Sequence, residues 1–389
     1  MKKGNIIKLV LIFVFLIFYG FIFRLSDGNK DLLNDVVKRT SGLPSFSERA
    51  RMTVSGKLDS LFKRANKRYD FNGSILVAKD GKLIFNSEYG YADFKKKTSI
   101  DSSSAFQLAS VSKQFTATAV LMLYEDSLIA LDDTLTRYFP EFPYQITIRQ
   151  LLIHTSGLPK YFWLAEHEWK KEKAPINTEM MGMISEYDLP LFFYPGSIFD
   201  YSNTGYMVLA SLVEKVSGLS YSDFIETNIF NPLKMTNTFV YRFGEDSTRS
   251  NQLEGYRIYR RWRHLAIPGT VNDGIVGDKN IYSTAEDLFK WINALNSGEL
   301  ISEESLEMMY TNGKTRRGRT VPYGFGFRIS NKETGKVIYH YGKWNGFSTG
   351  IKQYPDGLVI ILLEHSSYNS TSNLTKDVRS IIDAYFVDY

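Results

Sequence analysis

The sequence predicts an α+β fold with one antiparallel sheet built from both chain ends, flanked by helices, and with an inserted all-helical region. Two observations predict it. Strand patterns occur early, at Ser74–Lys79 and Lys82–Ser87, and return only beyond residue 320. The stretch between about residues 110 and 300 has mainly helical periodicity that Pro and Gly interrupt. When strands from both chain ends share a sheet, a helical stretch between them forms a separate region beside it.

The first elements are a helix and a hairpin. Residues 56–68 show the apolar spacing of an amphipathic helix. The two early strands flank Asp80-Gly81, and this dipeptide between two strand-like runs is a strong signal for a two-residue hairpin turn. A longer helical pattern begins near Ser110 and continues to about Asp126. The capping-box pattern Ser283-Thr-Ala-Glu286 predicts the start of another helix.

Late strands and a helix complete the predicted fold. The last helix is expected at about residues 374–386. The strand patterns before it are Tyr323–Ile329, Val337–Tyr341, Thr349–Tyr354 and Leu358–Leu363, the last two flanking a second turn signal at Pro355-Asp-Gly357.

Residues 1–24 are predicted to be a membrane anchor. Residues 6–23 are apolar apart from Lys8, and about 20 apolar residues in a helix span the hydrocarbon core. Lys2 and Lys3 precede this segment, which predicts a single-pass protein of the cell membrane with the folded domain on the extracytoplasmic side. A cleaved signal peptide is the competing interpretation, but no A-x-A cleavage pattern follows the segment.

The remainder divides into a polar juxtamembrane tether, residues 25–52, and one large domain, residues 53–389. The net charge of +5 resides in residues 1–52, because the rest of the chain has 38 basic and 38 acidic residues. A domain without a basic excess is a poor candidate for binding nucleic acid. The sequence has no cysteine and no metal, phosphate-loop or dinucleotide motif, so we expect neither a metal nor another cofactor.

Ser110-Val-Ser-Lys113 is the motif with the clearest chemistry. At the start of a helix, residues three apart lie on one face, with Cβ atoms about 5–6 Å apart. A serine hydroxyl becomes a good nucleophile when a neighbouring base accepts its proton, and a lysine amine can be that base if burial lowers its pKa. Backbone N–H groups at a helix N-terminus also stabilise a developing oxyanion.

The spacing alone is weak evidence, because Ser60-Leu-Phe-Lys63 shares it and is interpreted as the solvated face of a helix. Around Ser110 the context favours a site, since Phe106-Gln-Leu-Ala forms an apolar approach and small residues follow the lysine. Ser156 is not a rival nucleophile, because His154-Thr-Ser-Gly-Leu158 does not fit the G-x-S-x-G elbow.

Two further segments supply groups that such a site needs. In Tyr201-Ser-Asn203, the tyrosine hydroxyl can relay a proton to a leaving group, and the Asn203 amide can hold the lysine and a substrate carbonyl. In His340-Tyr-Gly342, the glycine lets a substrate backbone approach closely, and the next N–H, that of Lys343, can be an oxyanion donor. His340 can bind substrate or stabilise the tyrosine. Taken alone, the first segment is better explained as a turn and His340 as a satisfied histidine at a strand end.

With these residues in this order, the chain resembles the serine β-lactamase-related family, which includes class C β-lactamases, D-Ala-D-Ala carboxypeptidases and family VIII esterases. The resemblance extends from about Phe71 to the C-terminus. Each motif alone is weak evidence for this family, but many motifs in the order typical of the family are specific evidence for it. They are the three motifs above with Leu131–Leu135, Ile146–Leu158, Tyr194–Gly196, Asn231–Asn237, Tyr282–Asp287 and Tyr323–Phe327.

The resemblance implies a β-lactamase/transpeptidase-like fold and a serine hydrolase that works through an acyl-enzyme without a cofactor. Ser110 would attack a carbonyl, Lys113 and Tyr201 would move protons, and Asn203 would orient the site. Backbone N–H groups of Ser110 and Lys343 would form the oxyanion hole. The implied partner is a small acyl substrate, namely an ester, an amide or a D-amino-acid peptide, or else a cell-wall peptide.

The sequence departs from the family at two places. The third motif often has lysine where this chain has His340, and histidine is only partly charged at neutral pH, so weaker recognition of a substrate carboxylate is expected. Gly277-Asp-Lys-Asn280 replaces a glycine-rich turn and is expected to alter the wall of the site. A second hypothesis therefore remains, a non-catalytic membrane-tethered sensor or cell-wall binding module. A base beside the serine favours the enzyme.

Overall fold

The structure is a computed structural model that describes residues 47–244, 246–260, 263–333, 335–366 and 371–386. The predicted anchor and most of the predicted tether lie outside these ranges. Among the helices that are described, none combines the length and the apolar character needed to cross a membrane. One compact unit spans Arg51–Tyr385 and contains every element discussed below except the first turn of one helix.

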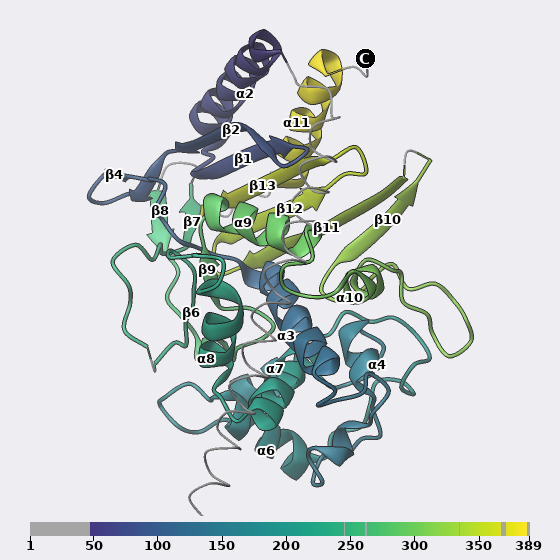
Figure 1. The fold of residues 1–389 in the computed structure, drawn as a ribbon. Helices are drawn as coiled ribbons and strands as arrows, with labels where there is room; N and C mark the ends of the chain where they lie inside the picture. Colours follow the sequence, from purple (N-terminus) through teal and green to yellow (C-terminus); the bar gives the residue numbers. More distant parts are fainter. Residues whose placement is uncertain (1–46, 245, 261–262, 334, 367–370, 387–389) are drawn as a thin grey trace, which may run out of the picture. The chain divides into compact units, whose positions relative to one another are not determined.

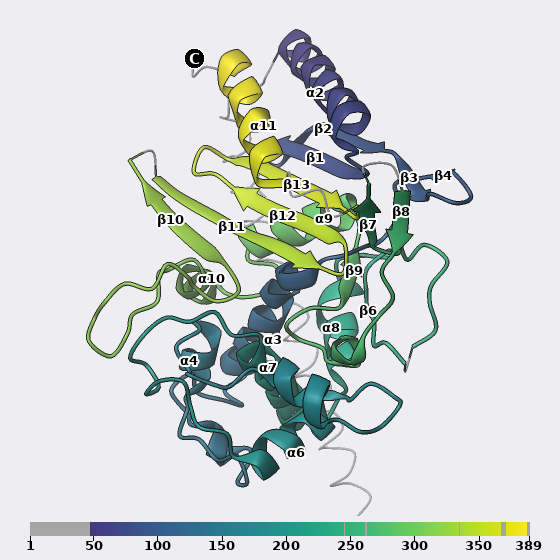
Figure 2. The same cartoon turned by 180° about the vertical axis from the view of Figure 1, so that it is seen from behind.

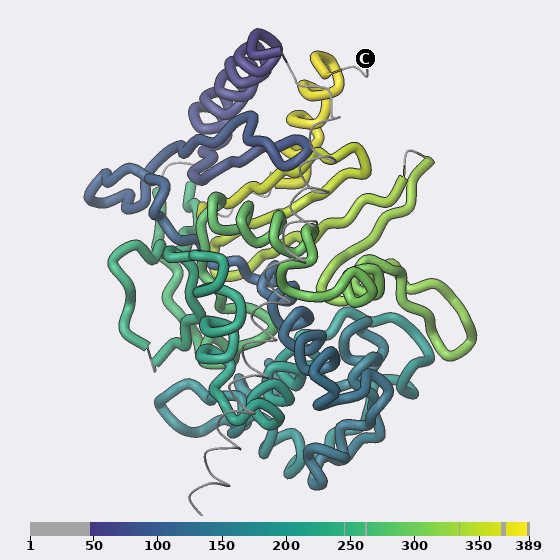
Figure 3. Tube along the Cα trace, in the orientation of Figure 1, coloured from purple at the N-terminus to yellow at the C-terminus, as the bar shows by residue number. Residues whose placement is uncertain are grey.

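The main sheet has six antiparallel strands in the order β10-β11-β12-β13-β1-β2 (Figure 1). Because β1 pairs with β13, the two ends of the chain meet in one sheet, which confirms the predicted architecture. Figure 3 shows this as purple and yellow segments side by side. The strands are β1 Gly73–Lys79, β2 Lys82–Tyr89, β10 Arg328–Lys332, β11 Gly335–Trp344, β12 Phe347–Gln353 and β13 Leu358–Glu364.

The turn between β1 and β2 follows the prediction closely. Asp80 and Gly81 have φ values of 50° and 72°. A two-residue turn of this kind needs positive φ at both positions, because its twist must match the right-handed twist of the strands. The Asp-Gly dipeptide therefore fixes the register of the first hairpin.

Helices cover both faces of this sheet. The helices α2 (Glu48–Tyr69) and α11 (Thr371–Tyr385) lie on one face, and α9 (Ala285–Asn296) lies on the other (Figures 1 and 2). The first of these begins within the segment predicted as tether, because the Ser47 side chain accepts a hydrogen bond from the Ala50 N–H and caps its first turn.

The start of α9 differs from the prediction by one residue. Thr284 is the N-cap and accepts from the N–H of Asp287. Ser283 belongs to β9 (Ile281–Ser283), and its hydroxyl bonds that of Thr238 at 2.7 Å instead. A serine and a threonine in sequence each fit the capping pattern, and tertiary pairing decides between them.

The middle of the chain is mainly helical, as predicted, but it also contains short strands that have no period visible in the sequence. The small strands are β3 Tyr91–Asp93, β4 Thr98–Ser99, β5 Phe106–Gln107, β6 Phe239–Val240, β7 Tyr256–Tyr259 and β8 Arg263–Ala266. The helices are α3 Lys113–Glu125, α4 Ile148–Leu152, α5 Tyr161–Trp163, α6 Asn177–Tyr187, α7 Asn203–Ser217, α8 Tyr221–Ile225 and α10 Glu303–Met309, and the single turns are η1 Ala109–Ser112, η2 Leu135–Arg137, η3 Leu164–Glu168, η4 Glu226–Phe230 and η5 Val271–Gly274.

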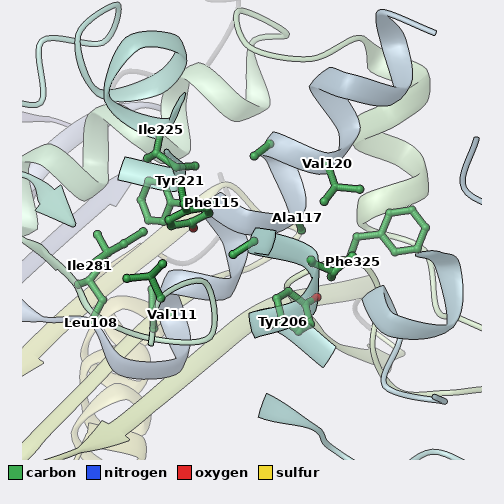
Figure 4. Close-up of a cluster of buried hydrophobic side chains, with 14 of the residues drawn as sticks. Leu108, Val111, Phe115, Ala117, Val120, Tyr206, Tyr221, Ile225, Ile281 and Phe325 are labelled. Carbon is green, nitrogen blue, oxygen red and sulfur yellow. The ribbon is translucent and has the colours of Figure 1, made fainter. Parts of the chain in front are cut away.

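Helix α3 forms the centre of the core and is buried on nearly every side. Figure 4 shows Phe115 and Ala117 of this helix among Tyr206 and Tyr221, which come from α7 and α8. The ring of Phe115 also stacks on Trp291 of α9 with a centroid distance of 4.2 Å. The helix is therefore held by the helical region and by the sheet layer together, so the residues at its N-terminus have a rigid support.

The segment Tyr323–Ile329, predicted as a strand, is mostly not one. Tyr323 makes only an isolated bridge to Arg328, where β10 begins. Gly326 has a φ of 77°, and a Cβ at this position would lie 2.9 Å from the Lys113 carbonyl oxygen. The chain turns here to pack against the backbone of α3, which an extended strand cannot do.

Replacing Gly326 by alanine is therefore expected to lower the free energy of unfolding by about 3–4 kcal/mol, since left-handed strain and a backbone clash add together. Chemical denaturation measures this loss. Gly318 is a matched control, because its φ is 76° and nothing lies within 4 Å of its Cβ position. Gly318→Ala should cost only about 1 kcal/mol. Equal losses in the two variants would mean that the close approach to α3 contributes nothing.

Candidate active site

Ser110 lies in the 3₁₀ turn η1, directly before α3, rather than in the α-helix that the sequence predicts. A 3₁₀ turn has three residues per turn, so positions i and i+3 align more closely than they do in an α-helix. Ala109 has a φ of 49°, a left-handed conformation that costs a non-glycine residue about 1–3 kcal/mol. This strained residue presents Ser110 at the surface while its neighbours stay buried.

Lys113 is fully buried below the serine. Its Nζ lies 3.2 Å from Ser110 Oγ, 2.8 Å from Asn203 Oδ1 and 2.7 Å from the Asp278 carbonyl oxygen. A neutral amine has two N–H donors and one lone pair. Asn203 and Asp278 offer only acceptors to it, so they take the two donors, and the lone pair is directed at the Ser110 hydroxyl.

The surroundings favour the neutral form of this amine. Burial lowers the pKa of Lys113 to about 8, with the Asp278 carboxylate opposing the shift and the Arg328 guanidinium contributing to it. A free lysine has a pKa near 10.4. A substantial fraction of Lys113 is therefore unprotonated at mildly alkaline pH, as a general base requires.

Tyr201 and Asn203 are positioned by the N-terminus of α7. Ser202 caps this helix, and its backbone N–H donates to Nδ1 of the buried His154 at 3.1 Å. The Tyr201 ring packs on His154 with a centroid distance of 4.3 Å. Burial raises the pKa of Tyr201, and the nearby Ser110 hydroxyl opposes this. The Tyr201 hydroxyl makes no well-formed hydrogen bond to any described residue, so it is poised to serve a bound group.

His340 lies on β11 with both ring nitrogens bonded to protein groups. Nδ1 lies 2.8 Å from the Tyr341 carbonyl oxygen, so Nδ1 carries the proton, and Nε2 accepts from the Tyr323 hydroxyl at 3.0 Å. Burial holds the pKa of His340 well below its ordinary value, with the charges of Lys113 and Arg328 adding to the effect. The residue is therefore neutral and fixed, and it acts on its surroundings by packing beside Tyr201, at 6.1 Å between centroids.

Gly342 brings β11 against the serine turn. A Cβ at this position would lie 2.2 Å from the Leu108 carbonyl oxygen, so only glycine fits. The same carbonyl accepts from the Thr349 hydroxyl at 2.7 Å, which ties the turn to β12. Lys343 follows on the strand with its side chain exposed. The hairpin then closes through Asn345-Gly346, whose φ values are both positive.

Two contributors were not singled out from the sequence. Arg328 comes from β10, and its guanidinium lies 5.1 Å from the Tyr201 ring centroid. In the sequence, Arg328 is recognisable only as a charged residue directly after the apolar segment Tyr323–Phe327. Asp278 contributes its backbone carbonyl, which no side-chain pattern reveals.

Chemically, the arrangement pairs a hydroxyl with a buried amine, adds a second proton carrier and places a strand edge beside the hydroxyl. Such a set can transfer an acyl group to Ser110 without a metal or cofactor. Of the residues expected from the sequence, Ser110 and Asn203 lie within hydrogen-bond distance of the Lys113 amine, and the Tyr201 ring centroid lies 5.1 Å from it. Gly342 lies against the serine turn instead, and His340 packs beside Tyr201.

Comparison with known proteins shows one family and one fold. The family model described as Beta-lactamase matches residues 58–382. Penicillin-binding protein 4* of Bacillus subtilis is 36% identical over 310 residues, which are 77% of this chain and 69% of that protein. The solved penicillin-binding protein of Bacillus halodurans is 25% identical with a TM-score of 0.72, over 85% of this chain and 99% of that chain. The D-amino acid amidase of Ochrobactrum anthropi is 24% identical with a TM-score of 0.68, over 87% and 99%, a likeness of fold alone.

Proposed function

The chain belongs to the beta-lactamase family of serine hydrolases, and from this premise we propose that it hydrolyses small esters, amides or D-amino-acid peptides through an acyl-enzyme on Ser110. One observation carries the proposal. The buried Lys113 amine lies 3.2 Å from Ser110 Oγ. Its N–H groups donate to Asn203 Oδ1 and to the Asp278 carbonyl oxygen. A protein that only binds its ligand has no need of a base in this position.

The proposed reaction has two halves. Ser110 Oγ attacks the substrate carbonyl while its proton passes to Lys113 Nζ, and the N–H groups of Ser110 and Lys343 stabilise the oxyanion. The proton then passes through the Tyr201 hydroxyl to the leaving group, and the C–O or C–N bond breaks. Water attacks the ester on Ser110 with the same groups acting in reverse, which releases the acid and restores the serine.

Covalent labelling tests this proposal. A fluorophosphonate and a fluorescent penicillin should each label the wild-type protein, and peptide mass spectrometry should map the label to Ser110. Turnover of p-nitrophenyl acetate should accompany the labelling. A protein that stays unlabelled by both probes and turns over no ester would instead fit the binding module of the same fold.

We further propose that peptides with a free carboxylate are preferred substrates. His340 is neutral, so the third motif supplies no positive charge at this position. Arg328 supplies a guanidinium beside Tyr201 and acts on Lys113, His154 and His340 as a nearby positive charge. A guanidinium matches a carboxylate in charge and in hydrogen-bond geometry.

Arg328→Gln should lower kcat/KM for a peptide that ends in a free D-Ala carboxylate by about 10- to 100-fold, the worth of one hydrogen bond to a charged group. On the alkaline plateau of the pH profile, where Lys113 is unprotonated in both proteins, the same variant should hydrolyse a neutral ester within about threefold of the wild-type rate, because a neutral ester has no carboxylate to bind. Steady-state kinetics on both substrates makes the comparison. Equal losses on both substrates would show that Arg328 does not recognise the carboxylate.

The predicted anchor in residues 1–24 bears on the setting of this activity. We propose that it holds the hydrolase at the extracytoplasmic face of the cell membrane, where cell-wall peptides are the available substrates of this class. Loss of the protein from the membrane fraction on deletion of residues 2–24 would support this location.

A further inference from the structure

The turn Gly277–Asn280 buries two adjacent charges. Asp278 and Lys279 are only 1% and 3% exposed, and a buried charge is costly unless it is paired. Lys279 Nζ lies 3.5 Å from Asp278 Oδ1. The Tyr161 hydroxyl joins the two, since it donates to Asp278 Oδ2 at 3.1 Å and accepts from Lys279 Nζ at 2.5 Å. The three side chains form a buried polar cluster in which Asp278 Oδ1 has the ion pair but no hydrogen bond among the described residues.

Three aromatic rings surround the Lys279 ammonium group and add cation–π contacts to its ion pair. Its Nζ lies 5.2 Å, 5.3 Å and 5.2 Å from the ring centroids of Tyr161, Phe162 and Trp344. Cations at such distances are attracted by the ring faces, most strongly when desolvated. Trp344 is fixed in turn, because its Nε1–H donates to Asp273. It follows Gly342 by two residues on β11, so both lie on the face toward the serine turn.

The backbone of the same turn holds the candidate base. The Asp278 carbonyl accepts from Lys113 Nζ at 2.7 Å. The turn is fastened on both sides of this carbonyl. The Gly277 carbonyl accepts from the Thr116 hydroxyl of α3 at 2.6 Å, and the Asn280 side chain donates to two backbone carbonyls upstream. The carbonyl that contacts Lys113 therefore moves with the buried pair.

We propose that Asp278 and Lys279, joined by Tyr161, are positioning residues for Lys113, holding the 278 carbonyl against its amine and balancing the charge around it. This inference rests on the proposed role of Lys113 as the base. The charged and titratable groups that surround the Lys113 amine from the neighbouring elements are Asp278, Lys279, Arg328, His154, His340, Tyr201 and Tyr206.

The two members of the pair affect Lys113 in opposite directions. The Asp278 carboxylate raises the pKa of Lys113 against the effect of burial. Burial lowers the pKa of Lys279, the Asp278 and Asp273 carboxylates oppose this, and the positive charge of Lys113 adds to the effect of burial. The repulsion between the two amines is mutual, so it also disfavours the charged form of Lys113. A variant that loses one charge should therefore shift the titration of the base in one direction, and a variant that loses the other should shift it in the opposite direction.

The experiment measures kcat/KM for p-nitrophenyl acetate against pH in three variants. Asp278→Asn should move the acid limb to lower pH, and Lys279→Met should move it to higher pH, each by at least half a pH unit. Tyr161→Phe keeps the ring and removes the bridging hydroxyl, so kcat should fall about tenfold. Lys290→Met is the matched control, because Lys290 pairs with Asp287 at 2.6 Å on α9, and it should leave both rate and profile unchanged.

The outcomes separate this inference from the proposed function. A wild-type protein without turnover or labelling at Ser110 ends the proposed function, and the inference with it. A wild-type protein that turns over, while folded Asp278→Asn and Lys279→Met both keep its acid limb, overturns the inference alone. Thermal melts establish folding. If a charge variant does not fold, Tyr161→Phe decides, and a wild-type kcat in that folded variant overturns the inference.

Discussion

A Ser110→Ala variant is expected to lose about 10⁴- to 10⁶-fold in kcat on every substrate that the wild-type protein hydrolyses, the range seen when a serine nucleophile is removed. The alanine methyl group cannot attack a carbonyl, so no acyl-enzyme forms. Without that intermediate, Lys113 has no proton to accept and the N–H donors have no oxyanion to stabilise. The fold should be unaffected, because the Ser110 side chain is partly exposed. Single-turnover and steady-state kinetics on p-nitrophenyl acetate measure the loss.

Ser60→Ala is the matched control for this prediction. Ser60 also stands three residues before a lysine, but its hydroxyl donates to the Gly56 carbonyl at 2.8 Å, and Lys63 pairs with Asp59 at 2.7 Å. This variant should keep the wild-type kcat. Substantial turnover by Ser110→Ala, or a comparable loss in Ser60→Ala, would contradict the assignment of the nucleophile.

Lys113→Met should lower kcat by about 10²- to 10⁴-fold, the usual contribution of a general base. The pH profile of the wild-type protein provides an independent check. Only the unprotonated amine accepts the Ser110 proton, and burial lowers the pKa of Lys113 to about 8. The value of kcat/KM should therefore fall about tenfold for each pH unit below about 8 and level off above it.

Lys63→Met should leave both the rate and the profile unchanged, since Lys63 is exposed on α2. A wild-type acid limb that persists in Lys113→Met would assign the titration to another group. A flat wild-type profile between pH 6 and 9 would mean that Lys113 is not the group that accepts the proton.

The arrangement of the sheet could be predicted because its signals are local. Asp80-Gly81 determines a turn by its own backbone preferences, and the buried strands β1 and β13 are continuous apolar runs. The prediction for Tyr323–Ile329 was wrong because Gly326 is required by a neighbour distant in sequence, the backbone of α3. The strands β6 to β9, each two to four residues long, exist through pairing alone and leave no periodic pattern.

The candidate site shows the same division. The motif around Ser110 and Lys113 could be found because a single turn brings its members together. The sequence also placed Asn203 beside the lysine, and the structure joins them at 2.8 Å. It could not reveal that both nitrogens of His340 are used within the protein, or that β10 brings Arg328 to Tyr201. Both facts depend on strand register and on side chains from other elements.

The Asn345-Gly346 hairpin has a consequence for how this protein can vary. Alternate side chains of β11 face the nucleophile, namely those at His340, Gly342 and Trp344. The length of the hairpin determines which set of alternate positions this is. Adding a single residue to the turn and shifting the pairing by one would replace Gly342 with Tyr341 or Lys343, where there is no room for a Cβ. Insertions or deletions of two residues in this hairpin therefore keep the same side chains of β11 facing the nucleophile. Insertions or deletions of one residue turn those side chains away and bring their neighbours in.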